Sequence, residues 1–226
     1  MSRDALYALC LGVLVVSWVV VYVELIRLGL RDRTFGMPVA ALCGNLAWEF
    51  QFAWLTPYEP LQQTADIIWF LLDLAILYTI VRFGPAEFPR LPRAAFHVLL
   101  GVGLAAALGL VNLLERALGD AASIYIGFGD TLLMSVAFVA MALARGNLRG
   151  QSLLVGYCMW IGTAFGSVAY YFFDDAHPRI ALVGYTGVLI FVFYAAYVAV
   201  LHSLRAAPRA TGTHPRHLSA EAEQPV

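Results

Sequence analysis

The stretch RDRTFGMPVAALCGNLAWEFQ, residues 31–51, joins a charged loop to a long apolar run that contains a single carboxylate, Glu49. A carboxylate inside a membrane span costs roughly 2.5 kcal/mol or more on insertion scales, so a function is expected for it. Asn45 lies one helical turn before Glu49 on the same face, and Trp48 flanks it. In a dry cavity Glu49 would resist ionisation. We therefore expect it to serve as a proton donor.

The composition is that of a membrane protein. The chain has 226 residues, of which 61% are hydrophobic and only 13% are charged, too few for a soluble domain of this size. The net charge is −1, and the basic residues do not cluster, so no nucleic-acid partner is expected. All 14 basic residues are arginine. The absence of lysine excludes a retinal Schiff base and with it a rhodopsin.

Seven long apolar segments predict an all-α fold, a polytopic seven-transmembrane-helix bundle. We expect it to work as a monomer among membrane lipids. Each segment has about 20 residues, enough to cross roughly 30 Å of hydrocarbon as a helix. Eleven of the 14 arginines lie in the first, third and fifth loops and in the tail, which are all on one side of the membrane. Because arginine is enriched on the cytoplasmic side, this places the N-terminus outside and the C-terminus in the cytoplasm. We expect one domain over residues 1–205 and a disordered cytoplasmic tail over 206–226. The predicted spans are 5–28, 37–56, 64–83, 94–115, 122–144, 151–173 and 180–203.

Polar residues form a stripe along the third segment. Gln62, Asp66, Trp69 and Asp73 are spaced by four, three and four residues, which places them on one face of a helix. Such a face cannot contact lipid, so we expect it to face the bundle interior or water. Asp66 lies close enough to the membrane surface that solvation is the alternative explanation for it.

Later segments add polar and aromatic residues to the same outer half of the bundle. Asp130 lies in the fifth segment, Tyr170 in the sixth and Tyr185 in the seventh. Convergence of such groups predicts a pocket. The alternative for Asp130, as for the carboxylates of the second and third segments, is purely structural hydrogen bonding between helices. Structural roles are also expected for two other features, a Glu24–Arg27 pair and a GxxxG pattern at residues 162–166.

One motif carries a family resemblance. The loop and second segment resemble those of the integral-membrane terpene cyclases of fungal meroterpenoid and indole-diterpene pathways, and here a bacterial relative is indicated by the arginine- and alanine-rich composition. The third segment continues the likeness with Trp69 and Asp73. The matching positions are Arg33, Thr34, Phe35, Gly36, Met37, Cys43, Asn45, Leu46, Ala47, Trp48 and Glu49.

The resemblance implies a cyclase that protonates the terminal alkene or epoxide of a linear prenyl chain, of farnesyl length, on a small molecule such as an indole alkaloid. A carbocation then closes rings without loss of diphosphate, so no metal and no other cofactor are needed. Glu49 matches the family's acid. Fungal members have a second aspartate in the last helix, where this chain has no carboxylate. Asp73 and Asp130 are the candidates for that role.

The chemistry of the residues agrees with this role. An acid that protonates an alkene must stay un-ionised and be shielded from water. Asn45 would orient Glu49, and Asp66 would help to bind the substrate. The ring faces of four aromatic residues would stabilise the travelling cation. These are Trp48, Trp69, Tyr170 and Tyr185.

Two other functions remain as alternatives. Residues 127–130 read GFGD, which resembles the GxGD motif of intramembrane aspartyl proteases, but the Tyr-Asp partner motif of presenilin-like enzymes is missing. A proton-coupled transporter or a lipid-binding sensor could use the same carboxyls. For either function, as for the cyclase, the bacterial cytoplasmic (inner) membrane is the expected location.

Overall fold

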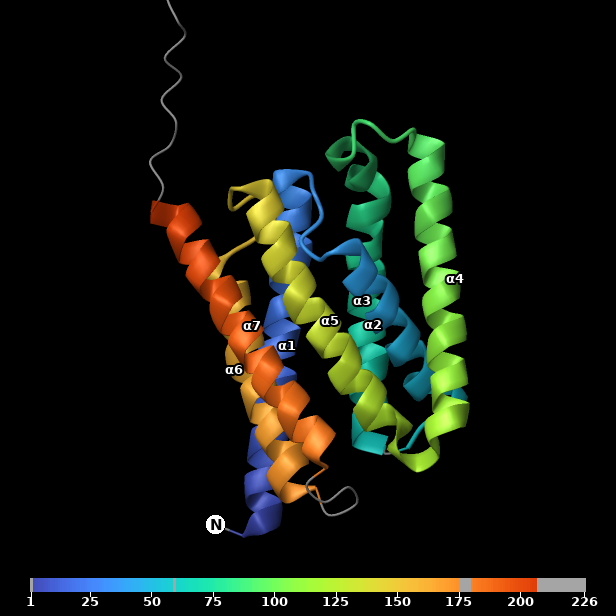
Figure 1. Ribbon diagram of the computed structural model, residues 1–226, viewed down its shortest axis with the longest axis vertical. Helices are drawn as coiled ribbons and strands as arrows, with labels where there is room; N and C mark the ends of the chain where they lie inside the picture. The colour runs from blue at the N-terminus through green and yellow to red at the C-terminus, as the bar shows by residue number, and fades with distance from the viewer. Residues whose placement is uncertain (1, 59, 175–179, 207–226) are drawn as a thin grey trace, which may run out of the picture.

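The computed structural model describes residues 2–58, 60–174 and 180–206. Every regular element in these residues is a helix, and the helices run up and down side by side in one bundle (Figure 1). The α-helices are α1 (Arg3–Asp32), α2 (Val39–Phe50), α3 (Pro60–Glu87), α4 (Arg93–Leu118), α5 (Ala122–Arg145), α6 (Leu153–Val168) and α7 (Ala181–Ala206).

Three short helical segments modify the ends of these helices. A 3₁₀ turn, Gly119–Ala121, joins α4 to α5. The π-helical turns Gln51–Leu55 and Ala169–Phe173 extend α2 and α6. Both π-helical turns lie at the end of the bundle that carries the N-terminus, since α2 and α6 run towards that end (Figure 1). Such turns are frequent at functional sites.

Five helical stretches in the described part of the chain are long and apolar enough to cross a membrane. One of them, Arg93–Arg145, contains both α4 and α5, and the 12-residue α2 does not qualify by itself. The all-helical membrane class is therefore confirmed. The seven-span count and the outward N-terminus stay predictions. The predicted tail, from residue 207 on, lies outside the described residues.

Glycine allows α1 and α6 to pack closely. A Cβ atom at Gly162 would lie 2.6 Å from Cβ of Ser17, and one at Gly166 would lie 3.1 Å from Leu14. Small residues that let two helix backbones approach are the usual means of helix association in membranes. The structural role predicted for the GxxxG pattern is confirmed.

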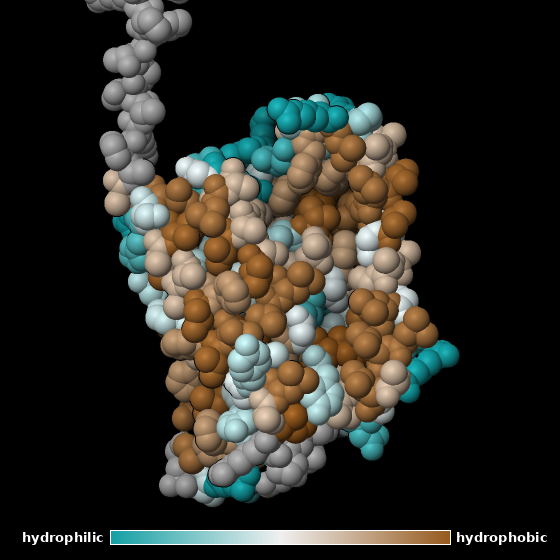
Figure 2. All heavy atoms as spheres, viewed as in Figure 1, coloured by the Kyte–Doolittle hydropathy of each residue, from teal (hydrophilic) through white to brown (hydrophobic). Residues whose placement is uncertain are grey.

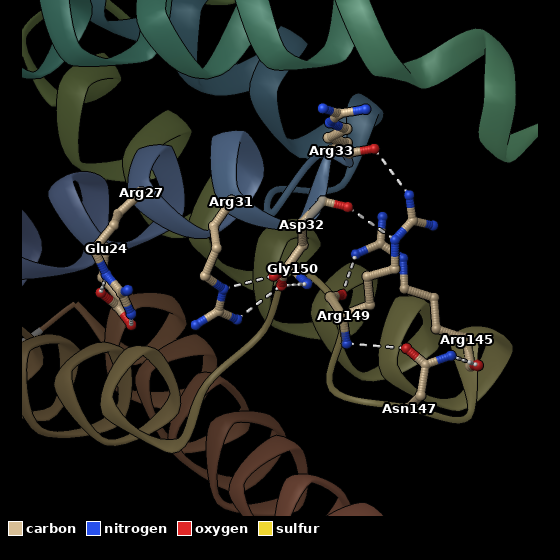
Figure 3. Close-up of polar contacts among 9 residues, drawn as sticks. All are labelled: Glu24, Arg27, Arg31, Asp32, Arg33, Arg145, Asn147, Arg149 and Gly150. Atoms are coloured by element: carbon tan, nitrogen blue, oxygen red, sulfur yellow. Dashed lines mark hydrogen bonds and ion pairs between the residues drawn. The ribbon is translucent and has the colours of Figure 1, made fainter.

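An arginine clamp closes the opposite end of the bundle (Figure 3). Arg149 donates to the backbone carbonyls of Asp32 (3.1 Å) and Arg33 (2.8 Å) and pairs with Glu87 at 2.6 Å. The Asp32 carboxylate in turn accepts a hydrogen bond from the backbone N–H of Gly150. These contacts tie the α1–α2 loop to the α5–α6 loop and to the end of α3. The loop arginines, predicted to set topology, therefore also hold three elements together.

The loop motif itself is part of the core. Thr34 and Met37 are fully buried, and Phe35 lies beneath the guanidinium of Arg145 at 4.6 Å. A Cβ atom at Gly36 would lie 2.8 Å from a Leu25 methyl and 3.0 Å from the Gly150 carbonyl oxygen, so this glycine lies in a closely packed place. On α1 the predicted Glu24–Arg27 ion pair is confirmed at 2.7 Å.

Candidate active site

A buried polar network brings together α1, α2 and α3. Glu49 is 1% exposed, and its Oε1 accepts hydrogen bonds from the Tyr22 hydroxyl (2.8 Å) and from Asn45 Nδ2 (2.8 Å). The same amide nitrogen donates to Asp73 Oδ2 (2.8 Å) and lies 2.5 Å from the Tyr22 oxygen. Asn45 thus joins the two carboxyls, Glu49 on its own helix and Asp73 on the neighbouring one.

The two oxygens of Glu49 have different surroundings. Oε1 has two donors, whereas Oε2 has no hydrogen-bond partner among the described residues. No described arginine forms an ion pair with this carboxyl, and a buried charge without a partner is strongly disfavoured. The arrangement suits a neutral acid whose C=O oxygen is Oε1. Its acidic proton then belongs on Oε2.

Glu49 and Asn45 line a central cavity that holds about 850 Å³ of space when its open mouth is included. The cavity lies between α1, α2, α3, α5, α6 and α7. Its lining residues come from the first halves of α3 and α5 and the second half of α6. The cavity therefore lies towards the N-terminal end of the bundle, the half in which the sequence predicted a pocket.

Aromatic rings form much of the cavity wall. Trp48 donates its indole N–H to the Ser123 carbonyl at 3.2 Å, which fixes the orientation of its ring. Trp69 is 7% exposed and lines the same cavity. Tyr170, on the π-helical turn after α6, packs edge-on against Phe128. The ring faces can therefore stabilise a positive charge in the cavity.

The polar stripe on α3 faces inward as predicted. Gln62, Asp66, Trp69 and Asp73 are all buried. Gln62 lines the cavity and donates to Asp66 Oδ1 at 2.7 Å, while its oxygen accepts a hydrogen bond from Tyr170 at 3.4 Å. Asp66 and Asp73 lie behind the cavity wall. They reach the cavity through the amides of Gln62 and Asn45.

Asp130 and Tyr185 differ in their placement. Asp130 is partly exposed and lines the central cavity, and its side chain forms no hydrogen bond with a described residue. The structure does not bring Tyr185 to the cavity, because its side chain is 65% exposed on the outer surface of α7. The helical period relates Tyr185 to other residues of α7, but it does not set how that helix is rotated in the bundle. Tyr185 is therefore withdrawn as a wall of the pocket.

Sequence reasoning missed the contribution of α1. Tyr22 donates a hydrogen bond to Glu49. Trp18, one turn earlier on α1, packs against Tyr22 with the two ring centroids 5.9 Å apart. Both residues line the cavity. Their spacing of four in an otherwise apolar segment could have indicated a polar face. The partner of that face could not be read from α1 alone.

The glycines of the GxGD residues are not required by close packing. A Cβ atom at Gly127 would make an ordinary contact, 3.4 Å from the indole nitrogen of Trp48, and one at Gly129 would meet no atom within 4 Å. Asp130 faces the cavity from the next turn of α5. Nothing in this geometry requires the protease interpretation.

Comparison with known proteins identifies the family. A model of the Pyr4-like transmembrane terpene cyclases matches residues 3–177. The Pyr4-family terpene cyclase mfmH of Annulohypoxylon moriforme is 31% identical over 189 residues, which cover 81% of this chain and 78% of the relative. The terpene cyclase dpasB of Apiospora sacchari is 27% identical over 201 residues, covering 81% and 80%. No solved structure is similar to the chain. The resemblance found in residues 33–49 is thereby confirmed: the chain belongs to the Pyr4-like transmembrane terpene cyclases and is a terpene-cyclising enzyme.

Proposed function

We propose that this enzyme protonates the terminal alkene or epoxide of a linear prenyl chain, of farnesyl length, carried by a small molecule such as an indole. The observation that carries the proposal is Oε2 of Glu49, which has no hydrogen-bond partner in the described part of the chain and belongs to a carboxyl lining a cavity walled by aromatic rings. Membership of the terpene cyclase family supports it, since such an enzyme closes rings in terpenoid chains.

The surroundings of the acid support the following reaction. Oε2 of Glu49 gives its proton to a terminal alkene carbon, forming a C–H bond and a carbocation, or to the epoxide oxygen, opening that ring. The carboxylate left behind keeps two donors on Oε1, from Tyr22 and Asn45, and hydrogen bonds to an ionised group are stronger than those to a neutral one. Successive alkenes then attack the cation and close rings. Loss of a proton forms the final alkene, so the product is an isomer of the substrate.

The other polar groups have distinct roles in this scheme. Asp73 reaches Glu49 through the Asn45 amide and acts as a hydrogen-bond relay. Asp130 lines the cavity itself, so it is our candidate for the second carboxyl. Trp48 and Trp69 stabilise the cation, and the Gln62–Asp66 pair orients the polar part of the substrate.

Several broader expectations belong to the same proposal. The enzyme works as a monomer without a cofactor, crosses the membrane seven times and has its N-terminus outside. The 12-residue α2 and the five-residue π-helical turn after it would together make the second crossing. The bacterial inner membrane is proposed from composition, whereas the relatives named here come from fungi.

The test is a product analysis with Glu49→Gln. Membranes that contain the protein are given farnesylated indole and phenol compounds, with and without a terminal epoxide, and products are identified by mass spectrometry and NMR. A ringed product of unchanged mass is expected from the native enzyme and from Glu115→Gln, an identical change outside the cavity. No product is expected from Glu49→Gln. Cyclisation that survives in Glu49→Gln would exclude Glu49 as the acid.

A further inference from the structure

A second hollow lies on the outer face of the bundle. It lies between α4 and α5, with α2 as its floor, and holds about 1630 Å³ when its open side is included. In Figure 1, α4 and α5 meet at their lower ends and separate upwards, and Figure 2 shows that this face is mostly hydrophobic. Apart from Tyr125 and Asp130, the lining is apolar. We call this hollow the α4–α5 groove.

The groove is long enough for an extended chain. Its α4 wall runs from Phe96 to Leu118, about 33 Å at the helical rise of about 1.5 Å per residue, which matches the thickness of the hydrocarbon layer. Leu99 and Leu110 on this wall are each 58% exposed. A membrane-dissolved hydrocarbon chain can therefore lie in the groove without leaving an apolar environment.

Glycines keep the groove deep. Gly103 on α4 faces α2, where an added Cβ would lie 3.3 Å from Cys43 Sγ, and Gly129 on α5 has no atom within 4 Å of such a position. An added Cβ at Gly44, on the floor, would collide with the Asp130 carboxylate. Larger side chains at these positions would fill the groove.

Asp130 connects the groove to the central cavity. Within the described part of the chain, it is the one residue that lines both hollows. Glu49, Asp66 and Asp73 are buried, whereas Asp130 is partly exposed and is not held by a hydrogen bond to any described side chain. Asp130 therefore marks the place where the two hollows lie closest to each other in the lining that they share.

We propose that the α4–α5 groove is the lateral entrance through which the isoprenoid chain of the substrate passes from the bilayer into the central cavity, past Asp130. The proposal rests on the proposed function, because it takes the prenyl chain as the occupant. The occupant follows from the apolar lining, the length of the groove and its junction with the cavity of Glu49. A substrate dissolved in the bilayer then reaches the acid without crossing water, which would quench the cation.

The experiment uses the full-length protein in liposomes and a farnesylphenol that carries a diazirine in its isoprenoid chain. After illumination, adducts are mapped by mass spectrometry. Adducts on α4 and α5 residues of the groove are expected in the native protein and equally in Glu49→Gln. Unlabelled farnesylphenol should suppress them. A phosphatidylcholine with a diazirine in one acyl chain forms the comparison arm.

Two variants fill the groove and one serves as control. Gly103→Leu and Gly129→Leu should lower groove labelling, and because displacing two methylene contacts weakens binding about tenfold, they should raise KM by about tenfold with kcat little changed. A Cβ atom at Gly129 would meet no atom within 4 Å, so we expect Gly129→Leu to fold. Gly101→Leu places the same side chain on α4, where an added Cβ also meets no atom within 4 Å, but outside the groove. It should behave like the native protein.

The outcomes separate the entrance from the catalytic proposal. If the native enzyme cyclises farnesylated compounds but the groove-filling variants match Gly101→Leu in labelling and KM, the entrance is refuted while the cyclase mechanism stands. The entrance would also be refuted if the phosphatidylcholine probe labels the groove and unlabelled farnesylphenol does not reduce this labelling. The groove would then be a lipid-covered face. Competed farnesyl labelling without any cyclised product would support the groove as a prenyl site and count against the proposed function.

Discussion

Replacing Tyr22 by phenylalanine is the sharpest test of the polar network. Tyr22 is 2% exposed, and its hydroxyl donates to Glu49 Oε1 at 2.8 Å. Phenylalanine keeps the ring and its packing against Trp18, so the variant removes one oxygen atom and little else. Glu49 Oε1 keeps Asn45 as a donor, and Asn45 keeps Asp73 as an acceptor. No remaining polar atom of the network is newly left without a partner.

The magnitude follows from when the hydrogen bond gains strength. The hydroxyl stabilises the Glu49 carboxylate that forms when Oε2 loses its proton, and a hydrogen bond to a charged group contributes about 1.5–3 kcal/mol, against about 1 kcal/mol for the bond to the neutral acid. Only the difference of about 0.5–2 kcal/mol affects kcat, so at about 1.4 kcal/mol per tenfold change in rate Tyr22→Phe should lower kcat by about 2- to 30-fold. The loss in folding stability should be only about 1 kcal/mol, because both partners keep another hydrogen bond.

The assay measures initial rates of cyclised product at saturating farnesylated substrate, together with thermal unfolding in detergent. Tyr194→Phe is the matched control, because Tyr194 is fully buried and its hydroxyl has no partner among the described residues. This control should retain the native kcat. A folded Tyr22→Phe enzyme with the native kcat, or an equal loss in both variants, would refute the assignment of Glu49 Oε1 as the supported oxygen of the acid.

Two further predictions concern helix packing and loop closure. Gly162→Leu should destabilise the bundle by about 1–3 kcal/mol, because its Cβ would lie 2.6 Å from a serine of α1; thermal unfolding should show this loss, and Gly12→Leu, which meets no atom within 4 Å, should not share it. Gly150→Ala combines a φ of 70° with a contact of 2.7 Å, so it should lower the unfolding temperature more than Gly146→Ala, where φ is 61° and no atom is near. Equal shifts at Gly150 and Gly146 would contradict the close packing of the two loops.

Relations within one helix could be predicted from residue spacing. Asn45 and Glu49 are four residues apart, and the structure joins them by a 2.8 Å hydrogen bond. The α3 stripe was predicted in the same way, and its members are buried. The reason is that the helical period places residues three and four apart on one face, whatever surrounds the helix. A membrane then requires polar faces to point inward.

Rotation and partner choice between helices could not be predicted in this way. Tyr185 was expected in the pocket because of its chemistry, but α7 is rotated so that this ring faces outward. Asp130 was expected in the site and lines it, but its place between two hollows depends on the separation of α4 and α5. Several rotations of a helix with a broad apolar surface bury similar areas. Packing against the neighbouring helices decides among them.

The sequence by itself determined the membrane class, the helical faces and the motif that places Glu49 one turn after Asn45. Only the tertiary structure decided which oxygen of Glu49 accepts two hydrogen bonds. The second donor to Oε1 is Tyr22, which lies on another helix and 27 residues away in the chain. The tertiary structure also decided that Arg149 closes the loop motif from 116 residues away. Hydrogen bonds act over about 3 Å, so they depend on side chains that the fold brings together, and spacing along one helix carries no information about those.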